Sequence, residues 1–177
     1  MTERLRVQIS AATLSKLFGV CVSAEQRQQG ILVGWDFTTE LKNEYTDAGH
    51  YHDPRQQRKQ VTLIISDYVP FDAEFLTYRG DTPLLTRLRN LLDPRAIKVD
   101  NVIGWFRLRG SLSKSVPSVR ERAFFMELHK ELNTPLTFML IKRIKDNHSN
   151  AGAMQCLAGL FEVEYKHTSS GDGNRRT

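Results

Sequence analysis

One stretch, residues 101–132, constrains the fold of this chain more than any other. Its first part, residues 101–110, is rich in Val, Ile, Trp and Phe, which suit a buried strand. After a loop, Ser118 and Glu121 have the spacing of a capping box, which satisfies two amide donors at a helix start. Apolar residues then recur at helical spacing up to Leu132. The stretch therefore predicts a strand that leads through a loop into a helix.

The remaining patterns predict strands and helices that alternate along the chain. Strands are expected at residues 5–9, 30–37, 61–71 and 135–144, with a strand or a hairpin at 154–165. Helices are expected at about 10–20, capped by Ser10, and at 82–92, capped by Thr82 with Pro83 in the first helical position. The polar stretch 38–60 is typical of a hairpin loop. This order predicts an α/β fold, a mixed β-sheet flanked by helices.

Length and composition indicate an ordinary globular domain. The 177 residues, 40% hydrophobic and 25% charged, suffice for one sizeable core. A net charge of +5 is more often a solubility feature than a sign of nucleic-acid binding. The two cysteines, Cys21 and Cys156, are expected as small core residues in a reducing compartment, although a disulfide between them stays open.

Targeting signals are lacking in the sequence. The N-terminus has no apolar signal core, and no apolar run approaches the roughly 20 residues that span a bilayer. We therefore expect no membrane association and a cytoplasmic or nuclear location.

The predicted strand and helix of residues 101–132 resemble the core of the MPN (JAMM) domain. In active members a strand ends in Gly-Trp-aromatic-His-x-His, and these histidines and an aspartate at the start of the next helix hold one zinc. Here Gly-Trp-Phe at 104–106 is followed by Arg107 and Arg109 at the histidine positions, and Glu121 falls at the aspartate position. An arginine is cationic and offers no lone pair to a metal. The resemblance thus implies a degenerate metal site without a bound cofactor, zinc being expected only in a partner enzyme.

The resemblance also bears on the general base, an upstream glutamate in active members. Its place falls at Arg27, with Gln28 and Gln29 beside it, and none of these is a carboxylate. Glu25 lies nearby, and a short shift would align it. Even then it would lack a zinc-bound water to activate. The resemblance implies a pseudoenzyme with no catalytic residues.

Over about residues 7–165 the order of predicted elements is similar to the Abraxas family, the inactive MPN subunits of BRISC and related deubiquitinase complexes. The features that carry this likeness are Arg-x-Arg at 107–109, Arg-Glu-Arg at 120–122, and similar segments at 30–34 and 65–70. Gly110 and a longer loop with Pro117 depart from the family pattern. Because family members continue into a coiled coil, residues 1–168 are expected to form the inactive MPN domain and 169–177 a disordered tail at a truncation point.

The resemblance implies a non-catalytic scaffold. It would form a heterodimer with an active zinc-dependent MPN deubiquitinase, or a higher-order assembly, and activate cleavage of 63-linked polyubiquitin. Other BRISC-type subunits would be further partners, and polyubiquitin an indirect one. The alternative is an inactive MPN subunit of the proteasome lid, the signalosome or translation initiation factor three. A zinc hydrolase using His50, His52 and Asp53, and a nucleic-acid-binding module, are weaker alternatives.

The helix at 118–132 is apolar on more than one side, since Phe124 and Leu128 share a side whereas Phe125 and Met126 point elsewhere. A core helix needs only one apolar stripe, and interfaces favour Phe, Met and Arg. A wholly buried helix is the alternative. The predicted partner interface consists of residues from this helix and the first one: Arg120, Phe124, Phe125, Leu128, Leu14 and Leu17.

Two further pairs of side chains have predicted environments. Alternation puts Arg107 and Arg109 on one face of their strand, where they either pair with Glu121 or remain solvated charges. Trp35 and Trp105 are expected in the core rather than as ligand platforms.

Overall fold

The computed structural model describes residues 4–23, 28–41, 58–72, 75, 82–110, 116–145 and 154–162. Several predictions concern residues outside these ranges: those for Arg27, Glu25, the three residues His50, His52 and Asp53, and the tail 169–177. Cys21 and Cys156 lie in described elements, but the structure does not describe their side chains.

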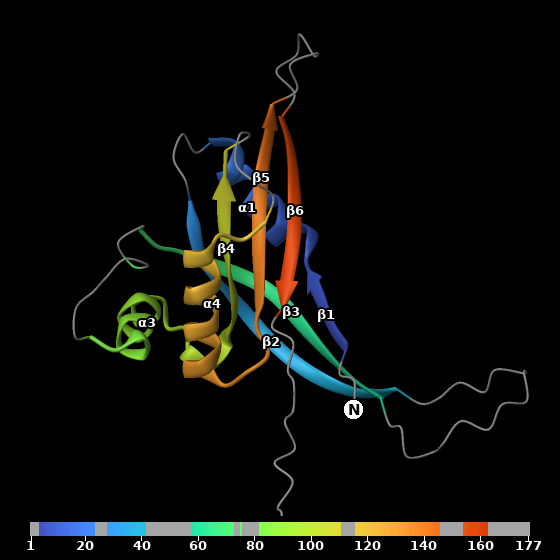
Figure 1. Ribbon diagram of the computed structural model, residues 1–177, viewed down its shortest axis with the longest axis vertical. Coiled ribbons are helices and arrows are strands. Elements are labelled where there is room, and N and C mark those ends of the chain that lie inside the picture. The colour runs from blue at the N-terminus through green and yellow to red at the C-terminus, as the bar shows by residue number, and fades with distance from the viewer. Residues whose placement is uncertain are drawn as a thin grey trace, which may run out of the picture.

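The architecture is a six-stranded mixed sheet in the order β1-β3-β2-β4-β5-β6 (Figure 1). Two neighbouring pairs, β1 with β3 and β4 with β5, are parallel, and the other three pairs are antiparallel. The strands are β1 (Arg4–Ile9), β2 (Gln29–Leu41), β3 (Arg58–Pro70), β4 (Val102–Arg109), β5 (Thr137–Lys145) and β6 (Met154–Glu162).

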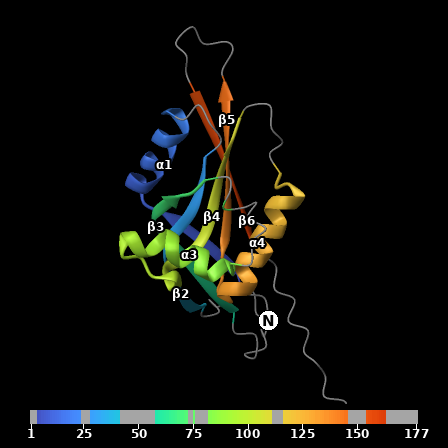
Figure 2. The same ribbon diagram turned by 90° about the vertical axis from the view of Figure 1, so that its left-hand side faces the viewer.

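Helices cover both faces of this sheet. Within the described residues they are α1 (Ala11–Ser23), α3 (Leu84–Leu92) and α4 (Val119–Leu132), with short 3-10 helices η1 (Asp93–Arg95) and η2 (Val99–Asn101). Figure 2 shows α1 and α4 on opposite sides of the strands. The predicted α/β fold with a flanked mixed sheet is therefore confirmed. No helix within the described ranges is long and apolar enough to span a bilayer.

The sheet separates two apolar cores, because side chains alternate between its faces. One core joins α3 and α4 to the sheet and contains Trp105, whereas the other contains Leu17 of α1 and Phe106. The Trp105 ring stacks on Phe138 at a centroid distance of 4.4 Å and meets Phe124 edge-on at 5.0 Å. The prediction that Trp105 lies in the core is confirmed.

Trp35 corrects the sequence prediction, because 52% of its surface is exposed. β4 pairs with β2 only from Gln29 to Val33. Beyond Val33, β2 no longer has β4 as a neighbour. The β2–β3 ladder continues to Leu41 and Arg58, further than the predicted loop boundaries of 38 and 60. Trp35 thus lies on a two-sided extension of the sheet rather than under a helix.

Helix starts follow their local capping chemistry, with one correction. The Ser10 hydroxyl accepts a hydrogen bond from the Thr13 amide at 3.0 Å, which confirms the predicted cap of α1. Thr82 does not cap α3: Pro83 is the N-cap, with an extended ψ of 148° and no side-chain cap bond. The helix begins at Leu84, because the carbonyl of Pro83 already accepts the Arg87 amide at 3.2 Å.

Candidate functional site

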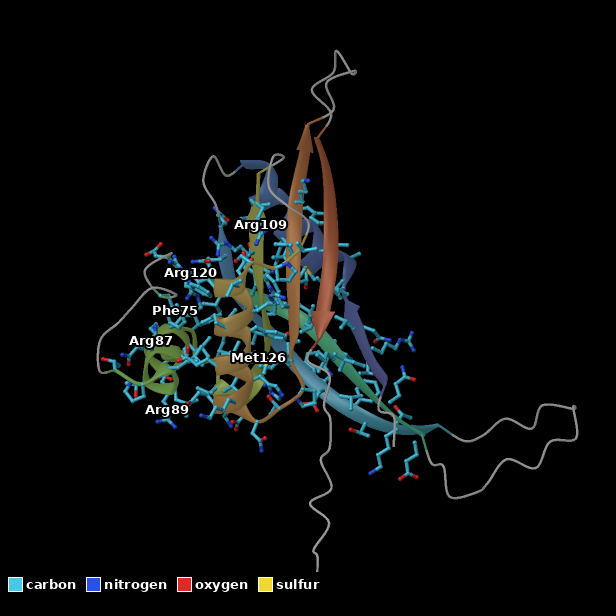
Figure 3. All side chains as sticks on the ribbon, viewed as in Figure 1. Phe75, Arg87, Arg89, Arg109, Arg120 and Met126 are labelled. Atoms are coloured by element: carbon cyan, nitrogen blue, oxygen red, sulfur yellow. The ribbon has the colours of Figure 1, made fainter. Side chains whose placement is uncertain are left out.

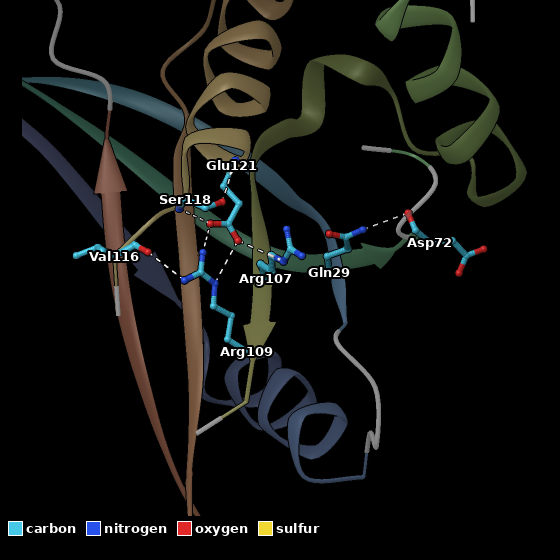
Figure 4. A network of polar contacts seen from close by, with 7 residues as sticks. All are labelled: Gln29, Asp72, Arg107, Arg109, Val116, Ser118 and Glu121. Atoms are coloured by element: carbon cyan, nitrogen blue, oxygen red, sulfur yellow. Dashed lines mark hydrogen bonds and ion pairs between the residues drawn. The ribbon is translucent and has the colours of Figure 1, made fainter. Parts of the chain in front are cut away.

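The end of β4 and the start of α4 bring two arginines onto one buried carboxylate (Figure 4). Arg109 Nε donates to Glu121 Oε1 at 3.2 Å, and Arg109 Nη2 donates to Glu121 Oε2. Arg107 Nε lies 3.3 Å from the same Oε1. Pairing with Glu121, which the sequence left open, is confirmed for both arginines. We call Arg107, Arg109 and Glu121 the Arg–Glu cluster.

Local structure positions the carboxylate of this cluster. The predicted capping box is confirmed: the Ser118 amide donates to Glu121 Oε2 at 2.6 Å, and the Glu121 amide donates to Ser118 Oγ at 3.3 Å. This reciprocal pair turns the Glu121 side chain back over the first turn of α4. Only 1% of the Glu121 side chain remains exposed, against 20% for Arg107 and 12% for Arg109.

Arg109 has a further partner that sequence reasoning missed. Its Nη1 donates to the carbonyl oxygen of Val116 at 3.0 Å. Arg109 thereby ties the residues just before α4 to the end of β4. No side-chain pattern could have revealed this contact, because a backbone carbonyl is the same at every residue.

Burial alone would raise the pKa of the Glu121 carboxyl. Hydrogen bonds from Ser118 and Arg109, together with the positive charge of Arg109, outweigh burial, so this pKa lies below its ordinary value of 4.5. Glu121 is therefore ionised at neutral pH, where the Arg–Glu cluster holds one negative and two positive charges.

Ser118→Ala tests the local half of this arrangement. The variant loses the hydroxyl that accepts the Glu121 amide but keeps the amide that donates to the carboxylate. We expect a loss of about 1 kcal/mol in the free energy of unfolding, measured by urea denaturation. Ser118→Thr, which restores a hydroxyl, should recover most of it. Equal stability of all three proteins would show that the hydroxyl bond contributes nothing.

The donor set of the Arg–Glu cluster does not fit a zinc ion. Guanidinium groups offer protons and no lone pair, and both oxygens of Glu121 already accept hydrogen bonds from Arg109 or Ser118. Among the described residues, no group of three or more His, Cys, Asp or Glu side chains could hold a metal.

The start of β2 lies beside Arg107 of the Arg–Glu cluster. Gln29 is in register with Arg107, and the Leu108 amide donates to the Gln28 carbonyl at 2.7 Å. Gln29 is buried, and its Nε2 donates to the Asp72 carbonyl at 3.1 Å. The amide of Gln29 thus joins β2 to the chain after β3, a structural contact that the sequence did not indicate.

The predicted partner interface needs correction. The side chains of Phe124, Phe125, Leu128 and Leu17 are buried in the cores of this chain and are not accessible to a partner. The ring of Phe125 packs against Phe138 at a centroid distance of 6.1 Å, so Phe125 points into the core. The buried stripe of the helix is therefore wide enough to include both Phe124 and Phe125. The predicted residues that stay at least partly exposed are Arg120 and Leu14.

The helix α4 has exposed residues of its own. Figure 3 labels Arg120 and Met126 of this helix, and 53% of Met126 is exposed. Val119, at the start of the helix, is 75% exposed. An interface on this helix would therefore use Val119, Arg120 and Met126 in place of the buried aromatic residues.

Comparison with known proteins identifies a family that this chain matches. The model of a family described as the BRCA1-A complex subunit Abraxas 1 MPN domain matches residues 8–162. No curated protein matches the chain significantly.

Proposed function

Because this chain belongs to the family of the Abraxas 1 MPN domain, we propose that it is a non-catalytic MPN subunit of a deubiquitinase complex. It pairs with an active zinc-dependent MPN deubiquitinase and activates cleavage of 63-linked polyubiquitin, as in BRISC-type complexes. Zinc belongs to the partner enzyme, and polyubiquitin meets this chain only indirectly. The complex, with its other BRISC-type subunits, resides in the cytoplasm, the nucleus or both.

The Arg–Glu cluster is the observation that carries this proposal. It occupies the strand end and helix start at which the resemblance places the zinc ligands of active members. Both of its arginines are cationic at working pH, and its only carboxylate is held by Ser118 and Arg109. A subunit with this cluster contributes structure rather than hydrolysis.

Activation requires contacts that differ between two states of the partner. A scaffold shifts an enzyme toward its active conformation only by binding that conformation more tightly than the inactive one. We place this contact on the exposed residues Val119, Arg120 and Met126 of α4. Leu14 of α1 would belong to a second, separate contact on the other side of the sheet (Figure 2). An inactive subunit of another MPN assembly would use the same surfaces with a different partner.

Cleavage of 63-linked di-ubiquitin tests the proposal with three samples: this protein, an active Abraxas-type partner enzyme, and the two co-expressed. We expect cleavage from the co-expressed pair at least about tenfold faster than from the enzyme alone. Arg120→Glu should reduce association and activity together, whereas Lys98→Glu, a matched charge reversal at an exposed residue before η2, should not.

Two results would contradict the proposal. Cleavage by this protein alone, with stoichiometric zinc, would show that it is an enzyme. A pair that neither associates nor gains activity would favour the proteasome lid, the signalosome or translation initiation factor three.

A further inference from the structure

The outer part of β2 exposes two large aromatic side chains on one face of the sheet. Trp35 is 52% and Phe37 46% exposed, and their spacing of two residues puts them on the same side. Ile64 and Thr62 of β3 lie in register beside them. A contiguous exposed apolar patch often marks an interaction surface, whereas a single exposed apolar residue is normal. Aromatic residues contribute strongly to binding at such surfaces.

The same part of β2 has one edge that no strand of the described residues pairs with, and we call it an open edge. β4 pairs with β2 only as far as Val33, and the Asn101 side chain donates to the Gly34 carbonyl at 3.4 Å. Within the described ranges, residues 35–41 then pair with β3 alone. Figure 1 shows β2 and β3 running together away from the helices. An open edge of this kind offers main-chain donors and acceptors to an added strand.

Charges indicate which kind of strand fits this edge. Asp36 and Glu40 alternate with the aromatic residues and point to the opposite face, where both are exposed. Glu40 lies opposite Lys59, but Asp36 lies opposite the buried Leu63. An added strand would thus meet an aromatic surface on one side and acidic side chains on the other.

We propose that residues 35–41 of β2, the docking edge, bind an extended segment of a protein partner in which apolar and basic residues alternate. Main-chain hydrogen bonds extend the sheet by one strand. The apolar residues of the segment pack beside Trp35 and Phe37, and its basic residues face Asp36 and Glu40. This proposal rests on residues away from the Arg–Glu cluster and does not depend on the deubiquitinase function.

Other occupants fit less well. A second copy of this chain, paired antiparallel about Thr38, would place Asp36 opposite Glu40 of the other copy twice, and like charges opposite each other destabilise a sheet. A nucleic acid could stack on Trp35, but its phosphates would meet the same two carboxylates.

Trp35 itself reports on the docking edge, because the only other tryptophan, Trp105, is 0% exposed. The probe is a synthetic peptide of about ten residues that alternates Val and Lys, and its control alternates Val and Glu. The Val-Lys peptide should shift the emission of Trp35 to the blue and reduce its quenching by acrylamide. It should bind at least about tenfold tighter than the Val-Glu peptide, and amide hydrogen exchange should slow within residues 35–41.

Exposed substitutions complete the test. The double variant with Asp36→Lys and Glu40→Lys should reverse the preference between the two peptides. Phe37→Ser should weaken the binding of the Val-Lys peptide. Glu127→Lys, a charge reversal at an exposed residue of α4, should change neither. An unchanged Trp35 signal up to about 1 mM Val-Lys peptide, or equal binding of both peptides, would overturn the proposal. So would protection of Trp35 by dimerisation or by a single-stranded oligonucleotide in place of the Val-Lys peptide.

Discussion

Replacing Gly104 by alanine is expected to leave the protein largely unfolded or insoluble. Gly104 has a φ of +155°, and a Cβ there would lie 1.9 Å from the carbonyl oxygen of Thr137. Thr137 is the partner of Gly104 on β5, in a parallel pair of strands. Because the clash is with backbone atoms, rotation of a side chain cannot relieve it. We expect a loss of more than about 4 kcal/mol, a large part of the roughly 5–15 kcal/mol that stabilises a typical domain.

Two other glycines provide matched controls for this substitution. A Cβ at Gly110 or at Gly19 meets nothing within 4 Å. Gly110→Ala should be close to neutral, and Gly19→Ala, inside α1, should stabilise by about 0.5–1 kcal/mol. Urea denaturation followed by the fluorescence of the buried Trp105 measures all three. If Gly104→Ala unfolds at the same urea concentration as Gly110→Ala, then β4 and β5 do not approach each other as described.

Glu121→Gln is expected to cost about 2–4 kcal/mol of stability at neutral pH. A glutamine keeps the size of the side chain and can still accept the Ser118 amide, so the capping box survives. What it removes is the charge that balances Arg107 and Arg109. Breaking a fully buried ion pair costs roughly 3–5 kcal/mol, and we expect somewhat less because both arginines retain some exposure.

The effect of Glu121 should depend on pH in a defined direction. Its pKa in the folded protein lies below the ordinary value of 4.5, so the unfolded chain takes up the proton first as the pH falls. The stability that its charge contributes is therefore fully present above about pH 4.5, and it is lost as the pH falls through the lower, folded pKa. Unfolding curves of the natural protein and Glu121→Gln should converge below that range.

Glu127→Gln is the control for this prediction, because Glu127 is exposed on the same helix. It should cost less than about 0.5 kcal/mol at any pH. A gap between the natural protein and Glu121→Gln that stays constant from pH 7 to pH 3 would mean that the charge of Glu121 does not stabilise the Arg–Glu cluster. In that case the loss would come from altered packing.

Most features that depend on near neighbours in the chain were predictable from sequence. The capping box at Ser118 and Glu121 and the cap at Ser10 are both confirmed. They could be predicted because donor and acceptor are three residues apart in the chain. The Gly-Trp-Phe strand and its following helix were also placed correctly. The chemistry of the Arg–Glu cluster was likewise readable, since an arginine carries its charge and lacks a lone pair in any fold.

Features that depend on contacts between residues far apart in the chain were not predictable from sequence. Whether Arg109 meets Glu121 depends on how β4 leads into α4, and the sequence left that pairing open. Trp35 was misplaced because its exposure depends on where β4 stops pairing with β2. Phe125 was misplaced because Phe138, a residue of β5, faces it across the core.

The amino-acid sequence by itself thus determined the strands, the caps of α1 and α4, the α/β class and the charges available at the candidate site. Tertiary structure alone decided which apolar residues became core, where the sheet ended, and which charges met. The physical reason is that capping and periodicity act over a few residues, whereas burial and ion pairing depend on partners that only the folded chain brings together.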